Sequence, residues 1–572
     1  MAIGDKILTD VLVIGGGGAG ARAALEAAKA GSEVILVDKG DFGKSGSTSH
    51  GVAEVAGFNV ADAVIDPDDS TEEHFRDILA AALGTCHPKL AGIVAEEAST
   101  ALRDLEEFGV AFEKADTGKY VEVKGCFASR PRMHIIKGHG IPIIRALSGQ
   151  LGRTDVKILN QTRVIDLLVH DGICLGGLCL DSRGDRLVIQ SKSTILTAGG
   201  AGQIFRYNLN PPEITGDGYA LGWRAGAKLI NMEFMQSGVG MVHPFTSMLS
   251  AWLWEGRPRL YNERNDDILI PYVPPGTSTE DCIYEKRKHM PFSSRDISRF
   301  VDIAIQAELT GREKENGRVY LDFTSVASRL QNLREDSDFR SMWRVTKDWM
   351  LDQGLDLTVT PFPVACFGHA INGGLLIDEH GETSIRNLFA AGEVAGGPHG
   401  ADRLGGNMLV TCQIFGKRAG QRAAQRSKEA RGQGNGRLIS RLVKRLDPKN
   451  EPGQALERDR ELLEVKKAIK DLLWRNYLVV KTGDSLDKCI EGINALREMT
   501  RDEKKLTGTL LDIRNMLETA QIMVLAAQER RESRGSHYRA DFPAIDPQWQ
   551  QSLQFWREGN QVKKEAKNFS NL

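Results

Sequence analysis

Apolar and polar positions near the start of the chain follow the order strand, helix, strand. Residues 8–14 (LTDVLVI) form an apolar run typical of a buried parallel strand, and glycines follow it directly. An alanine-rich stretch then continues to Gly31, and residues 33–40 (EVILVDKG) contain a second apolar run. This pattern predicts a βαβ unit, with two parallel strands side by side and a helix packed over them.

The next segments differ from one another in their periodicity. Residues 72–108 have helical spacing and Gly109 after them as a stop, while 155–197 contain runs that alternate like the strands of a meander. Residues 238–360 are rich in Trp, Arg and Asp, which predicts a separate lobe. Strand-like runs return in GGLLID and NLFAAGEV, and a helix is expected from Leu409 to about Lys428.

The last part of the chain is charged and periodic. Residues 429–436 (EARGQGNG) have the composition of a linker, and 437–531 predict a helical bundle. No regular element is expected after residue 533. The whole pattern predicts an α/β protein in which a discontinuous dinucleotide-type domain carries an inserted lobe and a helical domain at the end.

The glycines between the first strand and its helix are candidates for binding a phosphate. Gly15, Gly17 and Gly20 form GxGxxG, which permits a tight turn, a close approach of the backbone to a diphosphate, and close packing of helix on strand. Asp38 ends the second strand, where a carboxylate can accept ribose hydroxyls. A glycine turn without any ligand is the alternative explanation.

Two later runs favour FAD over NAD. Residues 385–396 (IRNLFAAGEVAG) resemble the segment that passes the flavin ribityl chain in FAD proteins of this fold, and 193–202 (STILTAGGAG) resemble their second glycine signature. The sequence therefore predicts a flavoprotein with a Rossmann-like FAD-binding domain.

Composition narrows the class of protein further. The chain has 572 residues, 26% of them charged, and a formal net charge of −2, so it lacks the basic character of a nucleic-acid binder. No apolar run reaches the length of about 18 residues that a membrane span needs. None of the 8 cysteines forms a CxxC pair, so no metal or iron–sulfur site is expected in this chain, and a reducing, cytoplasmic location is the default.

Several segments resemble one known family together and in order. They are SGSTSHGVAEVAG (45–57), VHPFTSMLSAWLWEG (242–256), SSRDISR (293–299), GHAINGG through HGADRLGGNML (368–409) and ESRGSHYRADFP (532–543). They resemble the flavoprotein subunit of the fumarate reductase and succinate dehydrogenase superfamily, which also includes L-aspartate oxidase and adenylylsulfate reductase. The run DPQWQQSLQFWREG (546–559) resembles the end of the succinate dehydrogenase subunit.

The resemblance implies five catalytic residues. His243 and Glu255 match positions that line a carboxylate site, His369 matches a histidine that binds a substrate carboxylate, Arg403 matches the arginine that clamps a second carboxylate, and Arg295 matches the arginine that transfers a proton. Taken one at a time, these residues also fit plain structural roles, such as an ion pair of Arg295 with Asp296 or of Arg403 with Asp402.

The chemistry of an unsaturated dicarboxylate suits these residue types. Adding a hydride to the double bond pushes negative charge onto a carboxylate, so cations and hydrogen-bond donors lower the barrier. An arginine has a pKa of roughly 12.5 or above, so it can donate a proton only as part of a relay. Glu255 and Asp296 are the candidates for the carboxylate that returns the proton.

The resemblance also implies the FAD-binding residues. His50 belongs to a Ser-His pair whose histidine can carry the flavin covalently, although a histidine lying beside the flavin without a bond is an equal alternative. The expected set is Gly15, Gly17, Gly18, Ala19, Gly20, Asp38, Lys39, Ser45, Ser49, His50, Gly51, Val164, Asp217, Glu393, Arg403, Asn407 and Leu409.

The family's domain plan can be placed on the chain by number. The expected parts are an FAD-binding domain (1–237 and 361–432), a capping domain (238–360), a C-terminal helical domain (437–545) and a tail (546–572). The chain lacks iron–sulfur motifs, so the resemblance implies a separate iron–sulfur subunit as partner, and a possible peripheral membrane position through partner subunits.

Departures from the family pattern leave the substrate open. The family's dicarboxylate enzymes have Thr before the Glu of TEG and a glycine-rich run after it, whereas this chain has Trp254 and RPRLYNE. The family's Asn is Asp402 here, and its Ser is Met408. The leading prediction is hydride transfer between FAD and a carboxylate-bearing C–C bond. The alternatives are oxidation of an amino acid, as in L-aspartate oxidase, and an electron-relay subunit without its own substrate.

Overall fold

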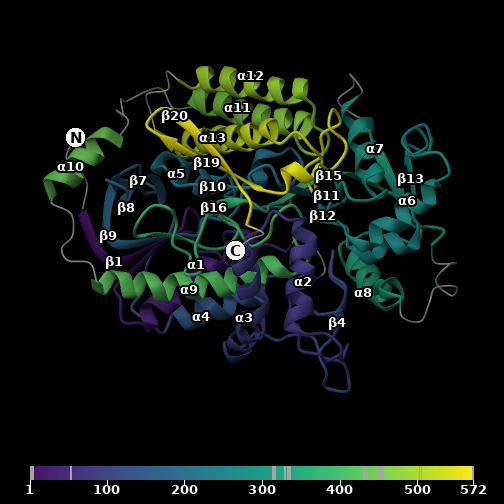
Figure 1. The fold of residues 1–572 in the computed structure, drawn as a ribbon, viewed down its shortest axis with the longest axis horizontal. Helices are drawn as coiled ribbons and strands as arrows, with labels where there is room; N and C mark the ends of the chain where they lie inside the picture. The colour runs from purple at the N-terminus through teal and green to yellow at the C-terminus, as the bar shows by residue number, and fades with distance from the viewer. Residues whose placement is uncertain are drawn as a thin grey trace.

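The fold was determined as a computed structural model. It describes residues 6–51, 55–311, 317–326, 330, 337–429, 436–446, 456–501, 503 and 506–569. The predicted linker 429–436 lies almost entirely outside these residues. Figure 1 shows an α/β body with a helical bundle along one edge and a lobe at one side.

A seven-stranded sheet forms the centre of the α/β body. Strand β1 (Lys6–Ile14) pairs in parallel with β2 (Val34–Val37) and β9 (Arg186–Leu196), with Val11 opposite Val34 and Ser193. The sheet is completed by β6 (Lys157–Leu159), β7 (Arg163–His170), β8 (Ile173–Leu180) and β17 (Leu388–Ala390). The predicted α/β fold class is confirmed.

Two helices cross closely over this sheet. Helix α1 (Gly18–Lys29) packs against α9 (Asn407–Glu429), and Figure 1 shows α9 running beside α1 across the body. An added Cβ at Gly416 or Gly420 of α9 would lie 2.7 Å or 2.4 Å from a carbonyl oxygen of α1. The close crossing therefore depends on these two glycines and brings residues about 400 positions apart to one side of the sheet.

A smaller three-stranded sheet lies beside the body. It has the order β3 (Val55–Asn59), β5 (Met133–Lys137), β4 (Glu122–Val123). The predicted helical region 72–108 consists of two helices, α2 (Thr71–Ala82) and α3 (Pro88–Glu107), because Leu83 adopts a left-handed conformation (φ 50°) that ends the first. Helix α4 (Ile141–Leu151) contacts α1.

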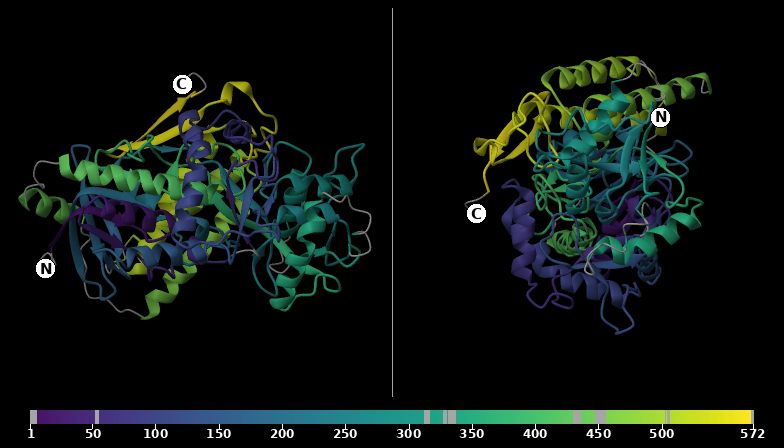
Figure 2. Two further views of the ribbon diagram at one scale, coloured as in Figure 1. Left: turned by 90° about the horizontal axis from the view of Figure 1, so that it is seen from below. Right: turned by 90° about the vertical axis from the view of Figure 1, so that its right-hand side faces the viewer.

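The lobe at the side contains a five-stranded sheet and three helices. The strand order is β12 (Ser247–Met248), β11 (Met235–Met241), β15 (Phe362–Ile371), β14 (Val319–Asp322), β13 (Arg259–Asn262). The helices are α6 (Thr279–Glu285), α7 (Arg299–Thr310) and α8 (Asp338–Asp352). Figure 2 shows this lobe projecting from the body. Strands β11 and β15 enter and leave it, so the lobe is an insertion.

The helical bundle comes from the end of the chain. Helices α11 (Leu456–Asn476), α12 (Gly483–Met499) and α13 (Gly508–Glu529) pack together, and α13 contacts α5 (Asp217–Ala225) of the body. Helix α10 (Gly436–Leu446) instead packs its apolar side chains against β7 and β8. Among the described helices, none is both long and apolar enough to cross a bilayer.

The prediction of an irregular segment after residue 533 is wrong for residues 552–567. These residues form a hairpin of β19 (Ser552–Glu558) and β20 (Gln561–Lys567). Strand β19 pairs with β10 (Leu229–Ile230), which continues into β16 (Gly374–Leu376) and β18 (Ala395–Gly396). The partner strand lies more than 300 residues away, so local patterning could not reveal the pairing. The other domain boundaries stay predictions.

A buried ion-pair network holds the segment after α13 against the body. Arg530 Nε lies 2.7 Å from Glu233 Oε1, and Arg530 Nη1 lies 2.8 Å from Glu532 Oε1. Arg530, Glu233 and Glu532 are all 0% exposed. Arg534 adds a third contact with Glu532 at 2.6 Å. Two guanidinium groups and two carboxylates therefore balance one another in the interior.

Replacing Arg530 by alanine is expected to destabilise the fold strongly. The change leaves Glu233 buried without its cation, which costs about 3–5 kcal/mol. The measurement is the midpoint of thermal unfolding of the full chain. Arg531→Ala, at the exposed neighbouring position, is the control and should leave the midpoint nearly unchanged. Equal midpoints for both variants would contradict this account.

Candidate active site

A cavity of about 370 Å³ runs between the α/β body and the lobe. The glycine loop before α1 lines one end, and His369 and Arg403 line the other. Residues of the lobe, among them Met248 and Trp252, close it from the opposite side. The cavity is thus built from both parts of the molecule and from segments across most of the chain.

The glycine loop has the turn that the sequence predicts. Gly15 has φ +103°, and an added Cβ there would lie 2.5 Å from the Thr197 carbonyl oxygen. At Gly20 an added Cβ would lie 1.8 Å from the Gly15 oxygen, so helix and strand can pack only with glycine at this position. Gly17 differs, because its Cβ position meets no protein atom within 4 Å and faces the cavity.

The N-terminus of α1 is suited to hold a diphosphate. Gly17 is the N-cap residue and offers no side chain to the first-turn amides. A helix N-terminus carries free N–H groups and a partial positive charge, both of which favour phosphate. The absence of side chains at Gly15 to Gly18 leaves room for the ligand to reach these amides.

Asp38 and Lys39 line the cavity, and both also form polar contacts with neighbouring protein groups. The Asp38 carboxylate accepts hydrogen bonds from Gly16 N at 3.1 Å, Gly40 N at 2.8 Å and Ser45 Oγ at 2.7 Å. Lys39 Nζ lies 2.9 Å from Asp217 and 2.7 Å from Asp512 of α13. All of these except Gly40 and Asp512 line the cavity.

The other end of the cavity contains a buried cation, Arg403, that forms no salt bridge in the described chain. Arg403 is 6% exposed, and its Nη2 lies 3.5 Å from His369 Nε2. Its Nη1 donates to the Leu404 carbonyl at 3.1 Å, its Nε has no hydrogen-bond partner, and no carboxylate of the described chain forms an ion pair with it. Burial lowers the pKa of Arg403 from its usual value. An anion in the cavity would meet this charge.

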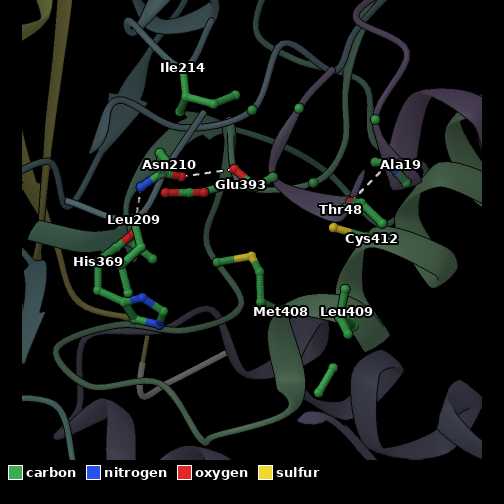
Figure 3. A pocket seen from close by; sticks show the side chains of 18 of the residues that line it. Ala19, Thr48, Leu209, Asn210, Ile214, His369, Glu393, Met408, Leu409 and Cys412 are labelled. Carbon is green, nitrogen blue, oxygen red and sulfur yellow. Dashed lines mark hydrogen bonds between the residues drawn. The ribbon is translucent and has the colours of Figure 1, made fainter. Parts of the chain in front are cut away.

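His369 is arranged as a neutral hydrogen-bonding group. Burial, with Arg403 and His139 nearby, lowers the pKa of His369 to about 3. Figure 3 shows its ring directed into the cavity near Met408, while Asn210 Nδ2 donates to the backbone carbonyl of His369 at 3.5 Å. The guanidinium of Arg403 and a neutral imidazole therefore lie side by side on one wall.

Arg295 lies behind this wall in a salt bridge with Asp402. Its Nη2 is 2.6 Å and its Nε 3.2 Å from Asp402 Oδ2, and the same oxygen accepts from Ser293 Oγ at 2.7 Å. The guanidinium also stacks on Phe127, with 4.7 Å to the ring centroid. Burial raises the pKa of Asp402 despite Arg295 and Ser293. Arg295 itself does not line the cavity.

Comparison with known proteins agrees with this architecture. The family model of an FAD binding domain matches residues 10–256 and 292–409, and the model of a fumarate reductase flavoprotein C-terminal domain matches 466–571. One subunit of the fumarate reductase (CoM/CoB) from Methanothermobacter marburgensis is 34% identical over 95% of this chain and 96% of that protein. The chain belongs to the fumarate reductase and succinate dehydrogenase flavoprotein family. It is therefore an FAD-dependent oxidoreductase.

Other relatives extend the comparison. An L-aspartate oxidase from Vibrio cholerae is 26% identical over 93% of this chain and 96% of its own length. Sdh1 of Mycobacterium smegmatis superimposes with a TM-score of 0.78 at 26% identity, covering 98% of this chain and 94% of that one. FrdA of the E. coli quinol fumarate reductase superimposes at 0.80 with 23% identity, covering 99% and 97%, which shows a shared fold.

Three of the five residues expected from the family pattern do not line the cavity: Arg295, His243 and Glu255. His243 is exposed at the surface of the lobe. Glu255 accepts hydrogen bonds from Ser337 Oγ at 2.8 Å and from Phe339 N at 3.4 Å, so it caps the start of α8. The structure brings His369 and Arg403 together, pairs Arg295 with Asp402, the residue before Arg403, and leaves His243 and Glu255 apart.

Trp254, a departure from the family pattern, lies away from the cavity. Trp254 is 0% exposed inside the lobe and does not line the cavity, with Lys286 Nζ 5.6 Å from its ring. The tryptophan that lines the cavity is Trp252, whose Nε1 donates to Thr346 Oγ1 at 3.1 Å. The 3-10 turn over Ala251–Gly256 turns the two side chains to different sides.

Most of the expected FAD-binding residues surround the cavity. Glu393, for example, lines it and accepts from Ile371 N at 3.0 Å, and burial raises the pKa of Glu393 to about 7. Gly20, Ser49, Gly51 and Asn407 do not line it. His50 is exposed and outside the lining, whereas the neighbouring His139 is inside it. A covalent flavin at His50 stays a prediction.

Several lining residues were missed by sequence reasoning. They are His139, Cys126, Trp252, Met248 and Met290. Met248 and Trp252 fall within the run 242–256, but no position of that run marks them as part of a site. Three of the five are apolar, and a chain of this size contains many apolar residues that belong to the core. Their common position became visible only in the folded chain.

Gly17→Ala is expected to weaken FAD binding without harming the fold. The new methyl group meets no protein atom within 4 Å but occupies the space that a diphosphate needs. The dissociation constant should rise at least about tenfold, or ~1.4 kcal/mol. The measurement is FAD titration of apoprotein by fluorescence, with thermal unfolding of apoprotein in parallel.

Gly149→Ala in α4 is the matched control, because its Cβ position is also open but lies away from the cavity. It should leave FAD affinity unchanged. An unaltered dissociation constant in Gly17→Ala would show that the diphosphate does not bind at this loop.

Proposed function

We propose that this protein transfers a hydride between FAD and a carboxylate-bearing C–C bond, and exchanges electrons with a separate iron–sulfur subunit. The observation that carries the proposal is the buried guanidinium of Arg403, which lies beside neutral His369 in the cavity wall, has an unpartnered Nε and forms no salt bridge in the described chain. A buried charge without a partner is costly, and a substrate carboxylate would remove that cost on binding.

Arg403 and His369 would hold the carboxylate and polarise the bond that reacts. FAD supplies the hydride chemistry when it is bound along the cavity. Arg403 can donate two parallel hydrogen bonds to one carboxylate, and the negative charge that develops during hydride addition is stabilised by the same guanidinium. His369 can add a neutral hydrogen bond.

Asp402 is the carboxylate that supports Arg295 in this proposal. Glu255 caps α8, and Asp296 Oδ2 lies 2.9 Å from His289, so neither of the two expected candidates contacts Arg295. Asp402 makes two hydrogen bonds with Arg295 and adjoins Arg403 in sequence. Movement of the lobe would bring Arg295 to the substrate, and Asp402 would keep it charged. After Arg295 gives up its proton, Asp402 would take a proton from solvent and pass it to Arg295.

The apolar residues of the cavity indicate which kind of substrate it can hold. Met248, Trp252 and Met290 line it near the carboxylate end, and neither His243 nor Glu255 is present to hold a second carboxylate. This arrangement favours a substrate with one strongly bound carboxylate and room for an apolar portion. Fumarate remains the simplest probe because a relative named for its reduction is 34% identical.

The curated relatives also favour testing amino acid oxidation. Several L-aspartate oxidases match nearly the whole chain at 26–28% identity. Such an enzyme would work without an iron–sulfur partner. The name of the 34% identical relative designates one subunit of its enzyme, which supports a multisubunit complex instead. Cytoplasmic location and attachment to a membrane through partners stay predictions.

Fumarate is expected to reoxidise the dithionite-reduced flavin of the purified chain. Arg403→Lys keeps the charge but loses the paired hydrogen bonds, so the second-order rate of reoxidation should fall about 10²-fold or more. The measurement is flavin absorbance in anaerobic stopped flow. Arg264→Lys, on an exposed side chain of the lobe, is the control.

Each result separates the candidate functions. Reduction of oxidised flavin by L-aspartate, with no response to fumarate, would support the amino acid oxidase. No response to any small unsaturated acid or amino acid would overturn the proposal and favour an electron relay.

Asp402→Asn is expected to slow the proton transfer at least about tenfold. Burial raises the pKa of Asp402, so its ionised form is lost as the pH falls through that pKa, and wild-type turnover should decline on that side. The variant has no group to titrate, so this decline should disappear from its pH profile. Asp185→Asn, at an exposed carboxylate that pairs with Arg183, should keep it. A profile unchanged by Asp402→Asn would exclude the relay.

A further inference from the structure

Three side chains that could bind a cation converge on the small three-stranded sheet. They are Asp62, which follows β3, Glu122 of β4 and His134 of β5. Glu122 and His134 are direct cross-strand partners, and Figure 1 shows β4 beside α2, on the side of the molecule away from the helical bundle. The three ligand atoms all lie within 4.8 Å of one another.

The distances are those of ligands around one metal ion. His134 Nε2 lies 3.0 Å from Asp62 Oδ2 and 3.3 Å from Glu122 Oε1. In a tetrahedral zinc site the ligands are about 2.0–2.1 Å from the metal, so neighbouring ligand atoms are about 3.3 Å apart. The separations observed here leave room for an ion between the three atoms with little movement of the side chains.

The second nitrogen of His134 supports this assignment. Its Nδ1 lies 3.2 Å from the Arg132 carbonyl oxygen, to which it can donate. In the neutral ring this leaves the lone pair of Nε2 directed at the two carboxylates. A backbone carbonyl that fixes the other ring nitrogen is the usual support of a metal-bound histidine.

Neither carboxylate has a lysine or arginine partner in the described chain. Glu122 is 2% exposed by side chain, and its Oε1 has no hydrogen-bond partner. In the described chain, neither Asp62 nor Glu122 forms an ion pair with lysine or arginine, and the nearby Arg132 is taken by Asp69 and Asp77. A buried, unpartnered carboxylate oxygen directed at the cluster is an independent sign that something positive binds there.

We propose that Asp62, Glu122 and His134 bind a divalent cation of the zinc class. One imidazole and two carboxylates suit Zn²⁺ or Mn²⁺ better than Ca²⁺ or Mg²⁺, which prefer oxygen ligands only. A water would complete a tetrahedral site. The expectation of no metal in this chain considered cysteine spacing alone, whereas these ligands come from three separate segments.

The position of the site gives it a structural effect on the flavin cavity. Met133, next to His134 on β5, and Val55, Ala56 and Gly57 of β3 line the cavity. A cation would tie the segment after β3 to both other strands, and so would fix this wall. The site lies apart from His369 and Arg403, so its existence does not depend on the proposed reaction.

The test is calorimetric titration of the full chain, with FAD bound, after removal of metals with EDTA. Zn²⁺ is the first probe and Mn²⁺ the second, and unfolding temperature is measured with and without each ion. The wild type should bind one equivalent at this site and unfold at a higher temperature with the ion. Glu122→Gln and Asp62→Asn keep the shape of the side chains and should weaken that binding at least about tenfold.

Glu113→Gln is the matched control, because this carboxylate lies on the same sheet region and pairs with Lys137 at 3.2 Å instead. It should bind the ion like the wild type. Two results would overturn the proposal. One is equal binding by all variants, which would place the ion elsewhere. The other is no binding by the wild type together with a more stable Glu122→Gln, which would mean that the two carboxyl groups share a proton.

Discussion

Balance of buried charge is the constraint on which this molecule depends. Arg530 is fully buried, and the carboxylates of Glu233 and Glu532 lie at hydrogen-bonding distance from its guanidinium. The charge of Arg295 is likewise balanced by Asp402, and its guanidinium stacks on the face of Phe127. Arg403 is the contrast, since it is buried in a cavity wall and hydrogen-bonds a carbonyl and a neutral histidine, while the carboxyl group of Glu393 acts on it without forming a salt bridge. Such a group raises the free energy of the empty site, and an anionic ligand lowers it again.

The architecture explains how that site is assembled. The α/β body supplies the glycine loop and the helix N-terminus at one end of the cavity, and the strand β15 that leaves the lobe supplies His369 at the other. Apolar residues of the lobe, such as Met248 and Trp252, close the opposite side. Because β11 and β15 connect the lobe to the body as a pair, small rotations about them can alter the distance between Arg295 and the cavity.

Two carboxylates near the site have partners that the sequence did not indicate. Asp402, at the position where the family's pattern has asparagine, pairs with Arg295, and Glu255 caps the start of α8. In the cluster of Asp62, Glu122 and His134, two carboxylates face one imidazole, and no lysine or arginine of the described chain pairs with them.

Local patterning alone determined the βαβ unit, the glycine turn and the helical character of the chain's end. Val11 to Val13 form an uninterrupted apolar run, and Gly15, Gly17 and Gly20 are set by backbone geometry within six residues. The resemblance of ordered motifs added His369 and Arg403. These features rest on neighbours along the chain or on spacing that a single sequence contains.

Only the tertiary structure decided which side chains share a space. In the folded chain Trp252 lines the cavity and Trp254 does not, and Asp402 is the partner of Arg295. Strand β19 pairs with β10 across more than 300 residues. The physical reason is that contact and burial depend on packing between distant segments. In the turn Ala251–Gly256, Trp252 and Trp254 are two residues apart, and only the folded chain decides which of them lines the cavity.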